Sequence, residues 1–215
     1  YVSELPEDAD VYRRDLTVEP AIFREHLNFL LANEYTSISL YDLHGALNHG
    51  HELPTNPIIL TFDDGYSDHY TNVLPMMNEF DFIGTFFVIT NRLDNADPSY
   101  ITWQQAQEMQ SNGMDIESHT KSHPDLRQRT YDFLIFEILG SVESITANIG
   151  ETSRIFSYPA GRYDNDTLQL LNSTSILLAT TTRHGRLHTT TAPFELRRLR
   201  VSGNIGVNGL RQLLE

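Results

Sequence analysis

The segment IILTFDDGY, residues 58–66, decides the fold. Its first residues are mainly branched and aromatic, and a proline precedes them, which is typical of a buried strand. Asp63 and Asp64 follow at the point where this strand should end. Two like charges this close oppose each other's ionisation, and burial adds to the cost, so the pair favours a nearby metal ion. Asp-Asp-Gly is also a common turn sequence, because Asp caps backbone amides and Gly takes positive φ.

Patterns of helix and strand alternate on both sides of this segment. Upstream, helical spacing covers 17–33, and alternation predicts a strand over 35–40 with a short helix to 47. Downstream, predicted strands cover 84–90, 114–117, 154–158, 176–181 and 196–201. Predicted helices cover 69–81, 102–113, 131–148, 167–171 and 207–214. About seven strands that alternate with helices predict an α/β fold, a parallel (β/α) barrel, with 1–215 as a single domain and 1–16 as an extended lead-in.

The composition limits the classes of ligand and partner. The chain has 215 residues, 40% of them hydrophobic, which suits one domain with a core of ordinary size. It has no cysteine, so any metal must be held by His, Asp or Glu. The formal net charge of -14 argues against nucleic acid as a partner, for which a basic surface is expected. No apolar span is long enough for a transmembrane segment, and the sequence indicates neither a leader peptide nor an oligomeric state.

Three polar segments follow predicted strands, and in a parallel barrel they would share one rim. They are the Asp63–Asp64 pair, the segment 119–123 and the segment 158–161. His119 and His123 are four residues apart, so on one helical turn both imidazoles would face the same side and share a metal ion. Two histidines and one carboxylate leave positions open on the ion, as in a catalytic site. Adjacent aspartates in extended backbone project differently, so one can bind the ion while the other takes a proton from water.

These residues resemble a known family. TFDDG at 61–65 and SHTKSH at 118–123 are similar to the first two motifs of the polysaccharide deacetylases, the NodB-homology or carbohydrate esterase family 4 enzymes. The resemblance continues through GTFFVIT at 84–90 and FSYPAGRYD at 156–164, so it covers most of the chain.

The resemblance implies both a fold and a set of roles. The implied fold is the distorted (β/α) barrel of the NodB type. Asp64, His119 and His123 would hold a divalent metal, usually zinc and sometimes cobalt or nickel, and Asp63 would be the general base. The implied reaction removes an acetyl group from a glycan, typically the N-acetyl group of N-acetylglucosamine units. The implied location is secreted or at the cell surface.

The third motif of the family departs from its usual form. It often reads Arg-x-Pro-Tyr, where the arginine orients the base and the residue after proline offers its backbone N–H to the oxyanion. Here SYPA at 157–160 takes its place, so the arginine is missing. A backbone N–H survives any change of side chain, so Ala160 can still serve the oxyanion. Arg198 is the candidate substitute for the arginine, with a surface arginine as the alternative.

Other roles are assigned less directly. Trp103 and Tyr158 are candidates for stacking on sugar rings, and Pro159 is placed with them in substrate binding. Trp103 lies in the first turn of a predicted helix, where it can equally belong to the core. The late histidine motif of the family, which supplies the general acid, has no clear match, because His184 and His188 are the only later histidines and lie in a Gly- and Thr-rich loop.

The sequence therefore predicts a metal-dependent carbohydrate N-deacetylase, and it leaves alternatives open. An acetyl xylan esterase would use the same site chemistry. A carbohydrate-binding protein with impaired catalysis would explain the missing arginine and the missing late histidine. An Fe(II) oxygenase with two histidines and one carboxylate ranks last, because Asp63 beside Asp64 would have no role in it.

Overall fold

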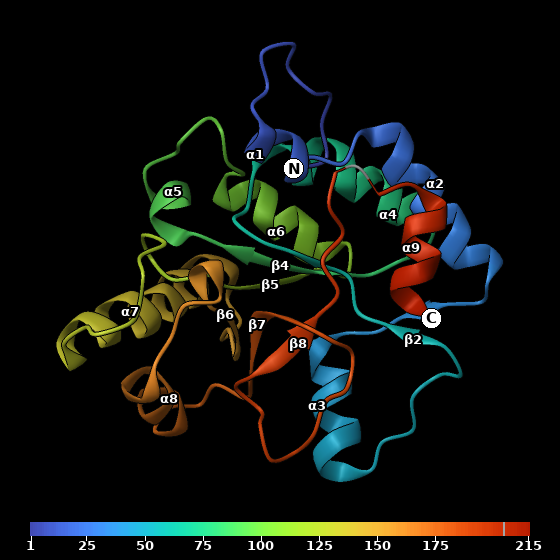
Figure 1. Cartoon of the computed structure of the whole chain (residues 1–215). Coiled ribbons are helices and arrows are strands. Elements are labelled where there is room, and N and C mark those ends of the chain that lie inside the picture. The colour runs from blue at the N-terminus through green and yellow to red at the C-terminus, as the bar shows by residue number, and fades with distance from the viewer. Residues whose placement is uncertain (204) are drawn as a thin grey trace.

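A curled sheet of six parallel strands forms the centre of the computed structural model, which describes residues 1–203 and 205–215 (Figure 1). In spatial order these strands are β3 (Thr61–Phe62), β4 (Thr85–Val88), β5 (Asp115–Ser118), β6 (Ile155–Ser157), β7 (Leu178–His184) and β8 (Leu196–Arg198). A separate parallel pair joins β1 (Thr36–Ser37) to β2 (Pro57–Ile58). The α/β fold of the NodB type is confirmed, with the main sheet forming a half-barrel, in which β3 and β8 are the two edge strands of the described sheet.

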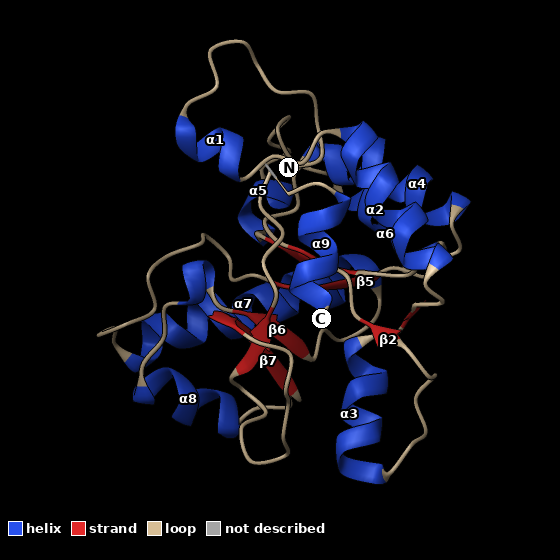
Figure 2. Cartoon of the chain, turned by 45° about the vertical axis from the view of Figure 1, so that its right-hand side comes forward, coloured by secondary structure: helices blue, strands red, loops and turns tan. Residues whose placement is uncertain are grey.

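Helices pack around this sheet (Figures 1 and 2). The N-terminal helices are α1 (Val11–Asp15), α2 (Pro20–Ala32) and α3 (Leu40–His49). The middle helices are the π-helix at His69–Val73, α4 (Leu74–Glu79), α5 (Thr90–Asp94) and α6 (Trp103–Ser111). The last are α7 (Tyr131–Ile149), a 3₁₀ turn at Pro159–Gly161, α8 (Asn165–Asn172) and α9 (Val207–Leu214). Among the described residues, no helix is both long enough and apolar enough to cross a membrane.

The capping residues explain several of these boundaries. Thr102 and Gln105 form the capping box that begins α6, as the sequence predicts. Ser39 and Asp42 form another at the start of α3, so the predicted strand over 35–40 shrinks to β1. Asp10 caps α1, so residues 1–16 are not wholly extended as expected. The helix predicted over 69–81 begins as a π-helix, next to a proline that has no N–H to donate.

The two faces of the sheet pack into different clusters. On β4, Phe86 packs with the cluster that contains residues of α2, α4 and α6, while its neighbour Phe87 packs with Leu40 of α3 and Leu196 of β8. Because β4 and β8 are far apart in the strand order, a shared cluster means that this face of the sheet is concave. Side chains of α3 therefore help to fill the inside of the half-barrel.

A buried carboxyl group also lies in this interior. Glu117 on β5 has 3% of its surface exposed. It accepts hydrogen bonds from the Tyr41 hydroxyl and the Ser153 hydroxyl, both at 2.5 Å, and from the backbone N–H of Ile155 at 3.1 Å. Burial raises its pKa to about 7, and these hydrogen bonds only partly offset the effect. Glu117 thus ties α3 to the sheet.

Candidate metal centre and active site

Asp64, His119 and His123 converge beyond the carboxyl ends of β3 and β5, the two strands that flank β4. Asp64 follows β3, and His119 directly follows β5. Asp64 Oδ1 lies 3.5 Å from His119 Nε2 and 3.4 Å from His123 Nε2, and one ligand atom from each residue lies within 4.8 Å of the others. In a tetrahedral zinc site with bonds of about 2.0–2.1 Å, two ligand atoms lie about 3.3–3.4 Å apart. The three residues therefore fit a shared divalent ion.

The backbone that brings the two histidines together is not helical. Residues 119–123 form no helix, and both Thr120 and His123 have positive φ, at 67° and 62°. The His123 N–H donates to Thr120 Oγ1 at 2.9 Å, which fixes this tight loop. The expectation that the spacing works through one helical turn is therefore wrong, although the two imidazoles do lie together, with ring centres 4.9 Å apart.

The orientation of His119 suits metal binding. Its side chain is almost fully buried, and Nδ1 lies 2.8 Å from the backbone oxygen of Ser157. Because that oxygen only accepts, Nδ1 carries the proton and Nε2 is left facing Asp64. Burial opposes the charged imidazole, but the hydrogen bond that the charged ring donates to Asp64 and the charges of Asp63 and Asp64 raise the pKa of His119. Burial and the neighbouring His119 lower the pKa of His123.

Asp63 makes no hydrogen bond to the histidines and is paired with Arg198 instead. Arg198 Nη1 and Nη2 lie 2.7 Å from the two carboxylate oxygens of Asp63. Arg198 Nε donates to the backbone oxygen of Thr181 at 3.0 Å, so the guanidinium is held from both sides. Burial alone would raise the pKa of Asp63, but the charge and hydrogen bonds of Arg198 outweigh it and hold this pKa well below its usual range. Asp63 is therefore ionised and oriented.

The segment after β6 places its residues differently from expectation. Ala160 is exposed and has a φ of 51° within the 3₁₀ turn. Tyr158 is fully buried, its hydroxyl donates to the backbone oxygen of Phe194 at 3.0 Å, and its ring stacks on Tyr163. Pro159 is also buried. Both side chains are thus covered by other parts of the protein, and a role for Tyr158 and Pro159 in substrate binding stays a prediction.

In the described structure, Trp103 and the two late histidines, His184 and His188, do not belong to the group formed by the metal ligands. Trp103 is half-buried, packs against the core and donates its indole N–H to Asp94 Oδ1 at 3.0 Å, which links α6 to α5. His184 is exposed at the end of β7, and His188 is half-buried in the loop after it. Among the described residues, no hydrogen bond or ion pair joins either histidine to Asp63 or Asp64.

Sequence reasoning missed an aromatic stack beside Asp64. The rings of Tyr1 and Tyr66 stack with centres 3.9 Å apart, and Tyr66 stacks on Tyr100 at 5.1 Å. Arg92 lies over Tyr100, with its guanidinium carbon 5.2 Å from the ring centre. Among these four residues, Tyr66 could have been found from the sequence, because it follows the Asp-Asp-Gly motif. Tyr1, Tyr100 and Arg92 reach the site through tertiary contacts.

Comparisons with known proteins agree with this geometry. The family model described as polysaccharide deacetylase matches residues 50–178. The chain is 28% identical over 187 residues to YxkH of Bacillus subtilis, named as a candidate polysaccharide deacetylase, covering 87% of this chain and 66% of that protein. It is 30% identical over 128 residues to the poly-β-1,6-N-acetyl-D-glucosamine N-deacetylase of Escherichia coli strain K12, covering 53% of this chain and 19% of that enzyme.

Solved structures show the same relationship. The deacetylase PplD of Streptococcus pyogenes, determined in complex with acetate, superposes with a TM-score of 0.92 at 28% identity. The match covers 100% of this chain and 94% of that chain. By contrast, the chain spans just under two thirds of YxkH and about a fifth of the Escherichia coli enzyme.

Proposed function

Because the chain belongs to the polysaccharide deacetylase family, we propose that it is a metal-dependent hydrolase that removes N-acetyl groups from N-acetylglucosamine units of a glycan. The observation that carries the proposal is the pairing of two neighbouring aspartates with different partners. Asp64 faces His119 and His123, while Asp63 is held by Arg198. One carboxylate is thus available to an ion and the other to a proton, which is the division of labour that hydrolysis by an activated water requires.

The proposed cofactor is a divalent ion, with zinc first and cobalt or nickel as alternatives, held by Asp64, His119 and His123. When bound there, such an ion lowers the pKa of a bound water and polarises an acetyl carbonyl. Nitrogen and oxygen ligands in this number suit zinc, and they leave a position open for substrate.

In the proposed reaction, Asp63 accepts a proton from the attacking water. Arg198 keeps the carboxylate ionised and fixes its direction through two hydrogen bonds, so little reorganisation is needed when the proton arrives. Ala160, an exposed residue, is proposed to donate its backbone N–H to the developing oxyanion. By orienting Asp63, Arg198 is proposed to replace the arginine that segment 157–160 lacks.

Two further proposals concern the chain as a whole. Residues 1–215 are proposed to act as one deacetylase domain. The protein is proposed to be secreted or to work at the cell surface, where polymeric glycans are encountered. The name of the Escherichia coli relative supports an N-acetylglucosamine polymer as substrate.

The test is release of acetate from N-acetylglucosamine oligomers and from acetylated xylan, measured side by side. The protein is first stripped with a chelator and then assayed with added zinc, cobalt or nickel. Metal-dependent release from the amide substrate is the expected result. Release from acetylated xylan alone would make the protein an esterase, and release from neither, with metal bound, would point to a carbohydrate-binding protein without turnover.

A further inference from the structure

The loop at residues 119–123, which carries both candidate histidine ligands, has a backbone that needs support from its neighbours. Thr120 and His123 have positive φ, at 67° and 62°, a sparsely populated conformation for residues other than glycine. Such backbone persists only when the surrounding structure holds it in place. The neighbouring elements that bond to this loop therefore bear on where the histidines point.

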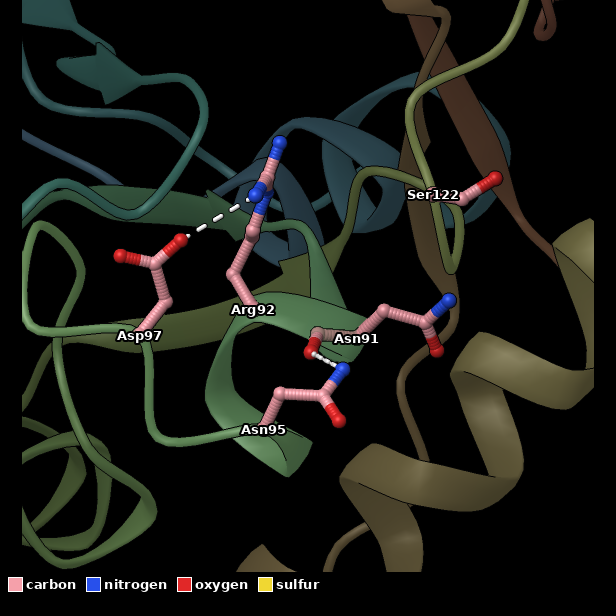
Figure 3. A pocket seen from close by; sticks show the side chains of 5 residues that line it. All are labelled: Asn91, Arg92, Asn95, Asp97 and Ser122. Carbon is pink, nitrogen blue, oxygen red and sulfur yellow. Dashed lines mark hydrogen bonds and ion pairs between the residues drawn. The ribbon is translucent and has the colours of Figure 1, made fainter.

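The helix α5 supports the first part of the loop. The backbone N–H of Thr90 donates to the Thr120 oxygen at 3.2 Å, and the N–H of Asn91 donates to the Lys121 oxygen at 2.9 Å. The next residue, Ser122, instead borders a cavity of about 230 Å³ that is also lined by Asn91, Arg92, Asn95 and Asp97 (Figure 3). Figure 3 shows the Ser122 hydroxyl directed away from these asparagines. Support for Ser122 must therefore come from another element.

Glu137 of α7 provides that support. Its Oε2 accepts the backbone N–H of Ser122 at 2.9 Å, and its Oε1 accepts the Ser122 hydroxyl at 2.6 Å. The backbone oxygen of Glu137 also accepts the N–H of Lys121 at 3.1 Å. Only 2% of the surface of Glu137 is exposed. Both of its carboxylate oxygens are thus bonded to the residue that directly precedes His123.

The same face of α7 contacts the chain before the loop and within it. Ser141 and Ser144 follow Glu137 by four and seven residues, so the three side chains lie along one stripe of the helix. Ser141 Oγ lies 2.5 Å from Ser118 Oγ, and Lys121 Nζ donates to Ser144 Oγ at 3.1 Å. This face of α7 therefore follows the chain from the end of β5 into the histidine loop.

A buried carboxylate is a costly group with which to hold a loop. Removal of its charge from water raises the free energy of the folded chain unless hydrogen bonds compensate. The nearby ammonium group of Lys121 is paired with Asp94 at 3.6 Å, and among the described residues no ion pair involves Glu137. The two donors of Ser122 are therefore the groups that stabilise the carboxylate, and the carboxylate in turn fixes Ser122.

We infer that Glu137 is a positioning residue that fixes His123 for metal binding by holding Ser122. The inference rests on the proposed function, because the metal centre is part of that proposal, and it adds a residue outside the ligand set. Glu137 acts on the backbone from which the His123 side chain projects. Without this hold, the loop would have to be ordered when the ion binds, and the affinity for the ion would fall.

The test measures zinc affinity by competition with a chromophoric chelator. Glu137→Gln keeps the shape of the side chain but replaces one acceptor with a donor, and it should lower zinc affinity by about tenfold. Ser122→Ala removes only the hydroxyl bond and should have a smaller effect. The double variant should lose no more affinity than Glu137→Gln alone, because both changes act through one contact. Glu143→Gln, at an exposed position on the same helix, is the matched control.

Two conditions separate positioning from a role in stability alone. The titrations are made below the unfolding temperature of every variant, where a purely structural residue would leave zinc affinity unchanged. The absorption spectrum of the Co²⁺-loaded protein reports ligand geometry, and it should change in Glu137→Gln but not in Glu143→Gln. Losses of zinc affinity that multiply in the double variant would show that Glu137 does not act through Ser122.

The outcomes also distinguish this inference from the proposed function. Lower zinc affinity in Glu137→Gln and Ser122→Ala supports the positioning role even if no form of the protein releases acetate. Zinc affinity and Co²⁺ spectra that are unchanged in both variants would overturn that role and leave the deacetylase proposal intact. Absence of zinc binding by the unsubstituted protein would overturn both.

Discussion

Arg198 and Asp63 form a bidentate ion pair across the open side of the half-barrel. Arg198 ends β8 and Asp63 follows β3, which are the two edge strands of the main sheet. Both oxygen–nitrogen distances are 2.7 Å, and Arg198 Nη1 also lies 3.3 Å from Thr61 Oγ1. Planar guanidinium and carboxylate groups match in this geometry, which fixes direction as well as charge.

Arg198→Lys should lower kcat by about 10–100-fold while the protein remains folded. A lysine ammonium is a point charge and does not reproduce the planar fork. Because Arg198 holds the pKa of Asp63 down, weaker pairing raises that pKa, and the acidic limb of the kcat/KM profile should move to higher pH. Arg197→Lys, at an exposed neighbour, is the control. An unchanged pH profile would show that Arg198 does not set the pKa of the group that titrates in catalysis.

Asp63→Asn should lower turnover by at least about 100-fold without loss of bound metal. The amide cannot take a proton at neutral pH, and among the described residues no hydrogen bond or ion pair joins Asp63 to His119 or His123. Acetate release and the metal-to-protein ratio should be measured on the same preparation. Retention of most of the activity would show that another group is the base.

His119→Ala should lower affinity for zinc by more than about 100-fold, since it removes a ligand and not merely a supporting contact. The affinity can be measured by competition with a chromophoric chelator. The addition of zinc should also raise the unfolding temperature of the unsubstituted protein and have little effect on the variant. His49→Ala, at an exposed position on α3, is the control for general loss of an imidazole. Equal zinc affinity in the two variants would contradict the ligand assignment.

Glu117 should make stability depend on pH. Its pKa is about 7 in the folded chain, against 4.5 for an ordinary glutamate, so the folded state binds more protons between these values. The stabilisation is fully present below about pH 4.5 and is lost as pH rises to about 7, by up to about 3 kcal/mol. Urea unfolding of the unsubstituted protein and of Glu117→Gln from pH 5 to 8 should show their free-energy difference changing in this direction. A constant difference would show that the carboxyl group stays ionised.

The fold and the residues in short motifs could be predicted from the sequence. Features that depend on tertiary contacts, such as the conformation of the histidine loop, could not. Asp64, His119 and His123 lie in local motifs, so their proximity could be predicted from the ends of parallel strands. The reason offered for the histidine spacing was wrong, because the positive φ of Thr120 and His123 depends on bonds within that loop. Apolar periodicity does not encode such a loop.

Other differences between the predicted and the observed structure also arise from tertiary contacts. The burial of Tyr158 depends on Phe194, which lies 36 residues further along the chain. The helix α5 has only five residues, too few for a helical period to be visible, and yet it lines the cavity beside the metal ligands. Its place in the predicted strand over 196–201 made Arg198 a candidate, whereas its pairing with Asp63 depends on how the two edge strands face each other.

The separation of Arg198 from Asp63 along the chain, 135 residues, also sets an order of assembly. All three candidate ligands are present once residue 123 has been made, whereas the partner of Asp63 is supplied only when β8 docks against β7. A chain cut between Ser157 and β8 would retain the ligands and the backbone oxygen that orients His119, and would lack the group that orients the Asp63 carboxylate. If Asp63 acts as the proposed base, the last strand of the sheet completes the site, and the orientation of the base is lost with that strand.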